Sequence, residues 1–490
     1  MLTQAQPMQR RLADAALAVG GRLLGDDAEF GAVSTDTRTI AAGSLFVALR
    51  GPRFDAHEFL AAAAAAGAVG AIVDHVPPPA RPQTEPPGAS TRAPAGSSAG
   101  APPGLILVSD TLLALQRLAQ VWRAGFTLPI VGVAGSNGKT TTKEMTAAIL
   151  ACRGPVLATR GNLNNHIGVP LTLLRLDPRH RSAVVEMGTN QPGDVAALMP
   201  LVRPAVALIT NAGAEHLEFF GDLDGVARGE GEAIAGLGSD GIAVLNADDP
   251  YVDYWRQVAG ARPVRTFGLR VPADVTAETV AASIEDGGFV TRFTLRTAEG
   301  STPVVLHAGG THNLVNALAA AAAAGAAGAT LADMQCGLAE FRAVSGRLQL
   351  KPGAAGSWII DESYNANPDS VRAGLDVLGA LAGSKWLVFG DMGELGAHAE
   401  ASHTEVGAYA RARGIERVFA LGRSTPGTVA CFGAGGEWFA DADALLRRLA
   451  PLLTAGVTVL VKGSRVNRLE RVVAGLTAAG AGATDPSGQH

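Results

Sequence analysis

The chain has 490 residues, of which 47% are hydrophobic, and its 40 basic residues are outnumbered by 45 acidic ones. This length predicts about three domains, each able to bury a core of its own. The net charge of −5 argues against a nucleic-acid-binding protein, which usually carries a basic excess.

Cysteine usage and apolar runs argue against a secreted or membrane protein. Cys152, Cys336 and Cys431 have no paired spacing, so we expect neither a disulfide framework nor a cysteine zinc site, and a reducing cytoplasm fits best. The N-terminus lacks the apolar block of a signal peptide. The alanine-rich stretches 61–66 and 317–332 predict packed helices rather than membrane spans, because alanine is too weakly hydrophobic.

The sequence of residues 1–126 predicts a small α/β domain. Short apolar runs at Leu45–Leu49, Ala71–Val73 and Leu105–Val108 read as strands, and a helix over Thr111–Ala124 closes the domain. Between the second and third runs, residues 77–104 are rich in Pro, Ala, Ser and Gly. This segment predicts a disordered insertion, because it has almost no large apolar residue to bury.

Residues 127–343 alternate strand-like and helical segments, which predicts a central domain with a parallel sheet. The buried strands are expected at Ile130–Ala134, Ala183–Glu186, Val206–Thr210 and Ile242–Asn246.

A phosphate-binding loop follows the first of these strands. The glycine-rich turn leads into a helix expected from about Thr141, and its residues are Gly135, Ser136, Asn137, Gly138, Lys139, Thr140 and Thr141. Backbone N–H groups and the helix N-terminus would face phosphate oxygens, Lys139 would add positive charge, and Thr140 would offer a hydroxyl to Mg²⁺. The preceding glycine, Gly132, lies one place too early for the strict pattern, but Gly-Lys-Thr after a strand favours ATP binding over an ordinary glycine turn.

Two further residues follow strands of the same sheet and are candidate metal ligands. Glu186 ends an apolar run, and His216 comes shortly after the strand that ends at Thr210. Both are expected at the carboxyl edge of the sheet, where ligands bind. The alternatives, a solvated glutamate at a loop start and a structural histidine, stay open at this point.

Residues 344–480 predict a second open α/β sheet of Rossmann-like type. Its strands are expected at Trp358–Ile360, Trp386–Phe389, Val418–Leu421 and Val457–Val461, with helices between them. Residues 481–490 read as a disordered tail.

Taken in order, these segments resemble the Mur ligase family over nearly the whole chain. The matching strings are 135–140, 161–170, 186–188, 210–211, 216–218, 312–317, 346–347, 361–368, 391–396 and 462–465. Phosphate loops are shared widely. The strings Ser-Tyr-Asn-Ala-Asn-Pro at 363–368 and Asp-Met-Gly-Glu-Leu-Gly at 391–396 are more specific, and resemble the branch of the family that adds D-alanyl-D-alanine.

The resemblance implies three domains: a small uridine-nucleotide-binding domain, a central P-loop ATPase-like domain and a C-terminal Rossmann-like domain. It assigns the first domain's substrate contacts to Ser34, Thr35, Asp36, Thr37 and Arg38, together with the stretch 43–57. Read from the residues alone, Arg38 suits a diphosphate, but a turn stabilised by Asp36 is nearly as good an interpretation.

The resemblance also implies contacts to ATP and to the other substrates. Asn313 and Asn316, one helical turn apart, suit a nucleotide base; without the family they would be helix-surface amides. Arg347 resembles a residue that reaches the ATP phosphates. Asp361 or Glu362 would meet the ribose, and Glu362 departs from the family's usual aspartate. The remaining substrate contacts are expected at Asn162, Asn164, Tyr364, Asn365, Asn367 and Glu394.

A second departure concerns a metal ligand. Family members commonly carry a carbamylated lysine fourteen residues after the histidine, whereas fourteen residues after His216 this chain has Glu230. We interpret Glu230 as a carboxylate that replaces the carbamate; the alternative is a solvated helix glutamate. The expected metal ligands are therefore Thr140, Glu186, His216 and Glu230.

The implied reaction joins D-alanyl-D-alanine to a UDP-N-acetylmuramoyl tripeptide with ATP and Mg²⁺, through an acyl phosphate, in a cytoplasmic monomer. Lys139, Glu186, His216 and Arg347 would carry the catalysis. Three alternatives remain. A sister ligase that adds the third residue would carry Asp-Asn-Pro-Arg, where residues 366–369 are Ala-Asn-Pro-Asp. Folylpolyglutamate synthase shares the central domain but lacks a uridine-nucleotide domain of this kind. A nucleotide-binding protein without turnover would not need Lys139, Glu186 and His216 intact.

Overall fold

The computed structural model describes residues 10–52, 54–76 and 102–481. Most of the expected insertion (77–104) and of the expected tail lies outside the described residues; of their described parts, Gly104 already belongs to a strand and Ala481 to a helix. Packing divides the chain into two compact units. The first contains residues up to 128 with 159–180 and 200–202, and the second contains the remainder. The boundaries expected at 126/127 and 343/344 stay predictions.

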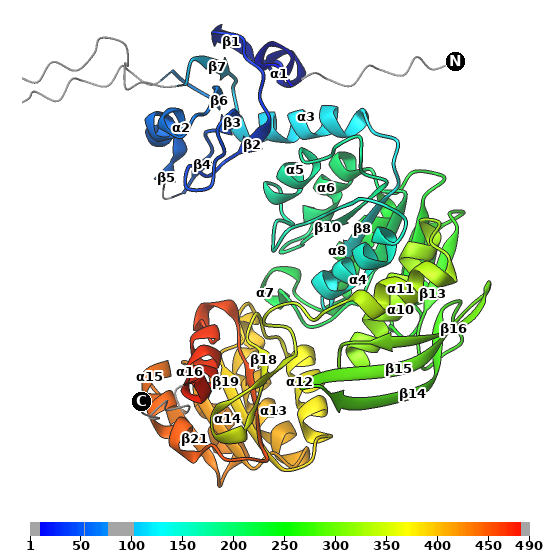
Figure 1. The fold of residues 1–490 in the computed structure, drawn as a ribbon, viewed down its shortest axis with the longest axis vertical. Helices are drawn as coiled ribbons and strands as arrows, with labels where there is room; N and C mark the ends of the chain where they lie inside the picture. The colour runs from blue at the N-terminus through cyan, green and yellow to red at the C-terminus, as the bar shows by residue number, and fades with distance from the viewer. Residues whose placement is uncertain (1–9, 53, 77–101, 482–490) are drawn as a thin grey trace, which may run out of the picture. The chain divides into compact units, whose positions relative to one another are not determined.

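The first unit contains a five-stranded sheet in the order β1-β7-β6-β3-β2 (Figure 1). All neighbouring pairs are parallel except β1 with β7. Its strands are β1 (Arg22–Gly25), β2 (Ala32–Ser34), β3 (Ser44–Val47), β6 (Gly70–Val73) and β7 (Gly104–Leu107), beside a hairpin of β4 (Arg50–Gly51) and β5 (Phe54–Asp55). Its helices are α1 (Leu12–Val19), η1 (Ala56–Phe59), α2 (Leu60–Ala65), α3 (Thr111–Ala124) and α5 (Gly168–Leu173).

The second unit begins with a fully parallel sheet in the order β13-β12-β11-β8-β10-β9. Its strands are β8 (Ile130–Ala134), β9 (Val156–Ala158), β10 (Ser182–Glu186), β11 (Val206–Ile209), β12 (Ile242–Asn246) and β13 (Val264–Phe267). The first strand, β8, therefore lies between β10 and β11. At such a change of strand order a crevice opens at the carboxyl ends of the strands, which is where ligands bind in open α/β sheets.

The helices of this region are α4 (Lys139–Ala151), α6 (Asp194–Val202), α7 (Leu217–Phe220), α8 (Leu223–Ala235), α9 (Val252–Ala259), α10 (Thr311–Ala326) and α11 (Leu331–Glu340). The alanine-rich stretch from 317 is a packed helix, as predicted, and Ala317 to Ala324 are at most 1% exposed. Small side chains on α10 allow it to lie against α4 and the sheet without a gap.

Three antiparallel strands follow the parallel sheet and were not predicted. They are β14 (Thr276–Glu285), β15 (Gly288–Thr297) and β16 (Gly300–Leu306), which lie side by side in Figure 1. Strand β15 buries Phe293 and Leu295 in the core that includes α10, whereas most of β14 is exposed. Because β14 has only Val280 and Ile284 as large apolar residues and they are not regularly alternated, it lacks the hydrophobic pattern by which strands are recognised.

The C-terminal region of the second unit forms a six-stranded sheet in the order β17-β18-β22-β19-β20-β21, parallel except at the β17 edge. The strands are β17 (Gln349–Pro352), β18 (Trp358–Glu362), β19 (Ser384–Gly390), β20 (Arg417–Leu421), β21 (Gly436–Phe439) and β22 (Val457–Lys462). The α-helices are α12 (Pro368–Gly379), α13 (Ala399–Ala412), α14 (Pro426–Phe432), α15 (Ala442–Leu449) and α16 (Glu470–Ala481), with short 3₁₀ turns η2 (Ala354–Gly356), η3 (Gly396–His398), η4 (Ala450–Leu452) and η5 (Arg465–Asn467). Two separate apolar clusters form its core. The predicted α/β fold class is confirmed.

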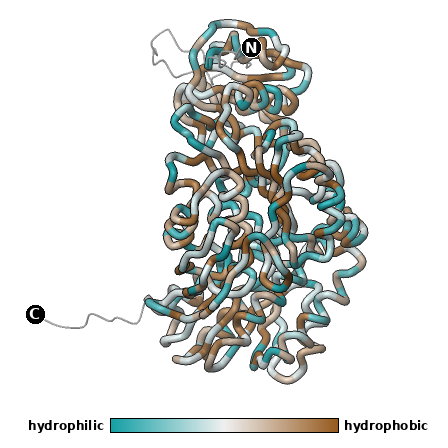
Figure 2. The backbone as a smooth tube through the Cα atoms, turned by 90° about the vertical axis from the view of Figure 1, so that its right-hand side faces the viewer, coloured by the Kyte–Doolittle hydropathy of each residue, from teal (hydrophilic) through white to brown (hydrophobic). Residues whose placement is uncertain are grey.

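Apolar and polar segments alternate along the whole tube of Figure 2. Within the described ranges, every helix is too short or too polar to span a bilayer.

Helices α4 and α11 cross at a glycine. A methyl group added at Gly337 of α11 would lie 2.3 Å from Cα of Ile149 in α4, closer than packed atoms approach. The absence of a side chain at this position is therefore what sets the spacing of the two helices.

We expect Gly337→Ala to destabilise the protein by roughly 1–3 kcal/mol, because the overlap with α4 forces the helices apart. This outweighs the roughly 1 kcal/mol by which alanine favours a helix over glycine. The urea midpoint of unfolding measures the change. The control is Gly238→Ala, where nothing lies within 4 Å of the added methyl. Equal midpoints for the two variants would contradict the packing argument.

Candidate active site

The phosphate loop fills the turn between β8 and α4. Gly135 and Gly138 have φ values of +113° and +82°, and a side chain at either position would also collide with a neighbour. The added carbon would lie 2.1 Å from Oγ1 of Thr210 at Gly135, and 2.3 Å from Oδ1 of Asn316 at Gly138. Only glycine fits both requirements. The helix begins at Lys139, two residues before the predicted start, because Gly138 forms its N-terminal cap.

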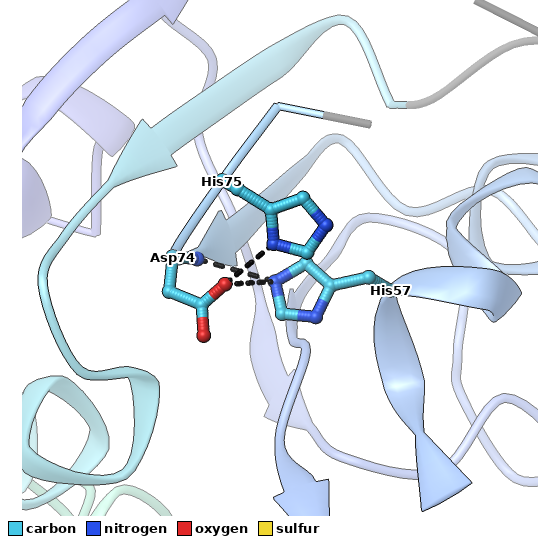
Figure 3. A group of neighbouring side chains, drawn as sticks. All are labelled: His57, Asp74 and His75. Carbon is cyan, nitrogen blue, oxygen red and sulfur yellow. Dashed lines mark hydrogen bonds and ion pairs between the residues drawn. The ribbon is translucent and has the colours of Figure 1, made fainter. Parts of the chain in front are cut away.

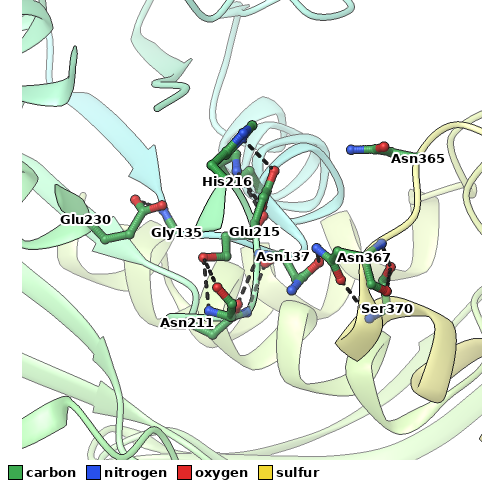
Figure 4. A network of polar contacts seen from close by, with 12 residues as sticks. Gly135, Asn137, Asn211, Glu215, His216, Glu230, Asn365, Asn367 and Ser370 are labelled. Atoms are coloured by element: carbon green, nitrogen blue, oxygen red, sulfur yellow. Dashed lines mark hydrogen bonds and ion pairs between the residues drawn. The ribbon is translucent and has the colours of Figure 1, made fainter. Parts of the chain in front are cut away.

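Asn211, which follows β11, holds the loop in place (Figure 4). Its carbonyl oxygen accepts from the Ser136 N–H at 2.9 Å, and its side-chain amide both accepts from the Asn137 N–H and donates to the Asn137 carbonyl, each at 3.0 Å. Strand β11 is the sheet neighbour of β8, so the loop's shape is fixed by the adjacent strand.

Lys139 is surrounded by carboxylates. Its Nζ donates to the Ser136 carbonyl at 2.9 Å and lies 3.7 Å from a carboxylate oxygen of Glu215. Burial opposes the charge, but the carboxylates of Glu215, Glu230 and Glu186 together raise the pKa of Lys139. The side chain of Lys139 is therefore a charged ammonium group at neutral pH, and it lies at the loop that the sequence predicts to bind phosphate.

Glu215 is a site residue that the sequence did not reveal. Besides Lys139, it contacts Nε2 of His216 at 3.2 Å, and only 15% of its side chain is exposed. Burial acts against the charged form, but Lys139 and His216 outweigh it and lower the pKa of Glu215. Its position directly before His216 was the available signal.

Thr140, in the first turn of α4, contacts Glu186 at the end of β10. The Thr140 hydroxyl donates to Oε1 of Glu186 at 3.3 Å, and both residues are buried. The guanidinium of Arg347, from the start of the C-terminal region, donates to the same hydroxyl at 2.9 Å. The sequence-predicted hydroxyl, carboxylate and arginine are thus brought together in one place.

Glu230 points from α8 into the phosphate loop, as Figure 4 shows. It is 1% exposed, and its Oε2 accepts from the Gly135 N–H at 2.6 Å. Burial raises the pKa of Glu230 to about 7, although Lys139 and the Gly135 N–H act in the opposite direction. The alternative of a solvated helix glutamate is therefore wrong.

His216 lies between two carboxylates. Its Nε2 is 3.2 Å from Glu215 and its Nδ1 is 2.7 Å from Oε2 of Glu394, which comes from the loop after β19. Burial favours the neutral ring, but hydrogen bonds to Glu215 and Glu394 outweigh it and raise the pKa of His216 to about 9. These contacts favour the imidazolium form in this arrangement, and a metal ion held by His216 would have to displace one of its ring protons.

The loop before α12 also contacts the phosphate loop. Asn367 caps α12 by accepting from the Ser370 N–H at 2.9 Å, and its amide donates to Oδ1 of Asn137 at 2.8 Å (Figure 4). Two residues later, Asp369 accepts from the Ala214 N–H at 3.0 Å. Residues far apart in sequence thus form one hydrogen-bonded network around the phosphate loop.

The amides expected to meet a nucleotide base are buried rather than on a helix surface, each being 7% exposed. Asn313 donates to the Gly309 carbonyl at 2.8 Å, and Asn316 donates to Asn313 at 3.2 Å and accepts from Thr142 at 3.3 Å. In this arrangement they fix the start of α10 against α4.

The two adjacent carboxylates at the end of β18 have different partners. Asp361 accepts from Lys351 and from the Ser363 hydroxyl, each at 2.6 Å. Glu362 pairs with Lys462 at 3.1 Å. Which of them meets a ribose stays open.

Two other residues of the 361–368 string contact cationic side chains. The Tyr364 ring is approached by the guanidinium groups of Arg347 and Arg465, at 4.3 and 5.3 Å from its centroid. The Asn365 carbonyl accepts from Lys462 at 3.1 Å.

The substrate contacts expected in the first unit form local turns. Asp36 accepts from the backbone N–H of Arg38 at 2.9 Å and pairs with its guanidinium at 2.7 Å. These contacts form the turn stabilised by Asp36 that was the alternative to a diphosphate site. Ser34 accepts from the Asp36 N–H at 3.1 Å. The Asn164 N–H donates to the Asn162 carbonyl at 2.8 Å.

His57, Asp74 and His75 form a second group of ligand-type side chains in the first unit (Figure 3). Asp74 lies 3.3 Å from Nε2 of His57 and 2.6 Å from Nδ1 of His75. The guanidinium of Arg50 provides a positive charge beside this group, since its Nη2 is 3.3 Å from Asp74 and 3.0 Å from His75. Asp55 contacts the other ring nitrogen of His57. We interpret the group as an ion-paired network that joins η1 to the end of β6.

Glu394→Gln should lower the pKa of His216 from about 9 toward its ordinary value, because the substitution removes one of the two carboxylates that favour the imidazolium ion. The ring would then lose its proton at a lower pH. An NMR titration of histidine-labelled protein measures the midpoint, and a His216→Gln spectrum identifies the signal. Glu400→Gln, an exposed change on α13, is the control. An unchanged midpoint in the Glu394 variant would contradict the role of this ion pair.

Comparison with known proteins agrees with this geometry. The Mur ligase middle domain matches residues 133–324, and the Mur ligase glutamate ligase domain matches residues 346–465. UDP-N-acetylmuramoyl-tripeptide–D-alanyl-D-alanine ligase of Escherichia coli K12 is 43% identical over 460 residues, which cover 94% of this chain and 96% of that protein.

Solved structures give the same result. MurF from Acinetobacter baumannii superposes with a TM-score of 0.83 at 32% identity and covers 97% of this chain and 99% of its own. MurF ligase from Thermotoga maritima, crystallised with ADP, has a TM-score of 0.75 at 28% identity and covers 91% of this chain and 97% of its own. The chain belongs to the Mur ligase family.

Proposed function

We propose that this chain is an ATP-dependent ligase that forms an amide bond between the tripeptide of UDP-N-acetylmuramoyl-tripeptide and D-alanyl-D-alanine, in the cytoplasmic stage of peptidoglycan synthesis. The observation that carries the proposal is the network at the phosphate loop. Lys139, Thr140 and Glu186 meet Arg347 of the C-terminal region there. The names of the similar proteins support the choice of substrates.

Mg²⁺ fits the donor set of this site. A phosphate loop attracts anions, yet Glu186, Glu215 and Glu230 add three carboxyl groups around it. A nucleotide triphosphate beside these carboxylates needs a cation between them. The ligand-type atoms are mostly oxygens, which Mg²⁺ prefers. We propose that Thr140, Glu186, His216 and Glu230 hold metal ions, which when bound neutralise charge on the phosphates.

The chemistry follows from positioning and charge. The terminal carboxylate of the tripeptide attacks the γ-phosphorus of ATP, giving an acyl phosphate and ADP. The amine of D-alanyl-D-alanine then attacks the acyl carbon, and the tetrahedral intermediate collapses to the amide and inorganic phosphate. Lys139 and Arg347 favour the first step by stabilising negative charge on the transferring phosphoryl group. The residues near the loop before α12, such as Asn367, would help to exclude water from the acyl phosphate.

The alternatives predict different substrates. A sister ligase would use a UDP-dipeptide and a free amino acid, and a folylpolyglutamate synthase would use a folate and glutamate. A protein without turnover would release no phosphate at all. The residues Ala366 and Asp369, which flank the Asn-Pro pair, differ from the sister ligase's expected Asp-Asn-Pro-Arg.

The direct test supplies purified protein with ATP, Mg²⁺, D-alanyl-D-alanine and UDP-N-acetylmuramoyl tripeptides ending in diaminopimelate or lysine. We expect a product heavier than the tripeptide by one D-alanyl-D-alanine residue pair, read by mass, and phosphate release that requires both substrates. Incubations with the substrates of the alternatives serve as controls. Phosphate release independent of the dipeptide would overturn the assignment.

Glu230 is proposed to replace the carbamylated lysine of its relatives at the second metal. Glu230→Ala should then lower kcat by on the order of 100-fold, because the second metal ion, which would neutralise charge on the reacting phosphates, loses a ligand. The matched control is Arg228→Ala, an exposed change on the same helix. Unfolding midpoints of both variants exclude loss of the fold as the cause.

A second variant separates the metal role from simple packing. Glu230→Lys should have low activity that rises when bicarbonate is added, because a carbamate on the lysine restores the carboxylate. Full activity of Glu230→Ala would contradict the proposed role of Glu230.

A further inference from the structure

Cys152 and Cys336 lie side by side although 184 residues separate them along the chain. Their Sγ atoms are 2.7 Å apart, with the Cys152 thiol directed at the Cys336 sulfur. A covalent disulfide measures about 2.0 Å, so the two thiols are within about 1 Å of bonding distance. Both residues are exposed. The spacing of the cysteines in the sequence gave no sign of this contact.

The helix packing explains why the two thiols meet. Cys152 is the C-cap of α4, directly after Ala151, and Cys336 lies in α11 directly before Gly337. Since Gly337 lets the α11 backbone approach the α4 backbone at Ile149, the two cysteines are held across the same crossing. Their proximity is a property of two packed helices, not of a loop.

We propose that Cys152 and Cys336 are an oxidisable pair that forms an intramolecular disulfide, reversibly linking the end of the phosphate-loop helix α4 to α11. This site is separate from the ligase chemistry and does not depend on the assigned substrates. Disulfides of proteins in reducing compartments are usually transient and respond to oxidants.

A peroxide is the oxidant that the reaction requires. One cysteine, as its thiolate, attacks a peroxide oxygen and becomes a sulfenic acid, while the other oxygen leaves as water after protonation. The second sulfur then displaces the hydroxyl of the sulfenic acid as water. The two thiols lose two protons and two electrons in total, and one peroxide is reduced to two waters. A thiol reductant reverses the bond by exchange.

The surroundings of Cys152 disfavour its thiolate form. Although Cys152 is exposed, partial desolvation of its sulfur raises the pKa of the thiol to about 12, and the Cys336 thiol and the carboxylates of Asp333 and Glu340 act in the same direction. Arg153 lies 3.9 Å from Asp333. Because the thiolate is the attacking form, oxidation should accelerate as the pH rises from 7 to 9.

The disulfide should stabilise the protein without disturbing the phosphate loop. Helix α4 has 13 residues, so Lys139 at its start is about 20 Å from Cys152. The bond closes a long loop, which in the chain-entropy account restricts the unfolded state strongly. We expect oxidation to raise the midpoint of thermal unfolding by on the order of 5 °C and to change ligase activity less than about twofold.

The test treats the purified full-length protein with hydrogen peroxide and follows free thiols, intact mass and unfolding. We expect two of the three thiols to disappear, with the loss of two hydrogens in mass and no intermolecular dimer. Proteolysis without reductant should yield a peptide pair linked through Cys152 and Cys336. Dithiothreitol should restore both the thiols and the original unfolding midpoint.

Three variants make the result specific. Cys431→Ser, which removes the cysteine on α14, should oxidise like the parent protein. Cys152→Ser and Cys336→Ser should each keep their remaining thiols unlinked and show no rise in the unfolding midpoint. Three free thiols in the treated parent protein, a link to Cys431, or an equal rise in the Cys152 variant would each overturn the proposal.

Discussion

The charge of Lys139 is the constraint on which the rest of the site depends. A buried ammonium group is costly unless nearby anions compensate it, and here Glu186, Glu215 and Glu230 do so from three separate segments. The strand order brings these segments together, since β8 lies between β10 and β11. A triphosphate added to the same place would bring further negative charge next to these carboxylates. The carboxylates that stabilise Lys139 therefore also support the proposal that a metal cation accompanies the nucleotide at this loop.

The C-terminal region also forms hydrogen bonds with residues of the phosphate loop. Arg347 donates to the Thr140 hydroxyl, and Asn367 donates to Asn137, so residues after position 344 already bond to the groups that would meet ATP. Entry of the nucleotide must exchange some of these bonds for bonds to phosphate oxygens. A nucleotide that makes stronger contacts than it breaks will favour the arrangement in which both regions contact it. Such an exchange would couple ATP binding to the position of the C-terminal residues.

Much of this could be predicted from the sequence, and the failures have physical reasons. The strands β8 and β12 have the predicted bounds, because continuous apolar runs between turn residues are strong signals. The fold class and family are confirmed. The β14–β16 sheet was missed because the exposed β14 has no clear apolar pattern. Glu215 was missed because its importance comes from its contacts with Lys139 and His216, which depend on tertiary structure. The roles assigned to individual residues in substrate binding stay predictions.

The first and last turns of helix α4 have different packing requirements. Its first turn follows the phosphate loop, whose glycines have left-handed backbone conformations. Asn316 of α10 lies against Gly138, so this end of α4 can move little relative to α10. Its last turn must let α11 approach closely, which Gly337 allows. The fully buried alanine face of α10 holds the helix between these points. Because α4 is a rigid rod packed along its length, a bond at Cys152 can add stability at one end while the phosphate loop at the other end keeps its geometry.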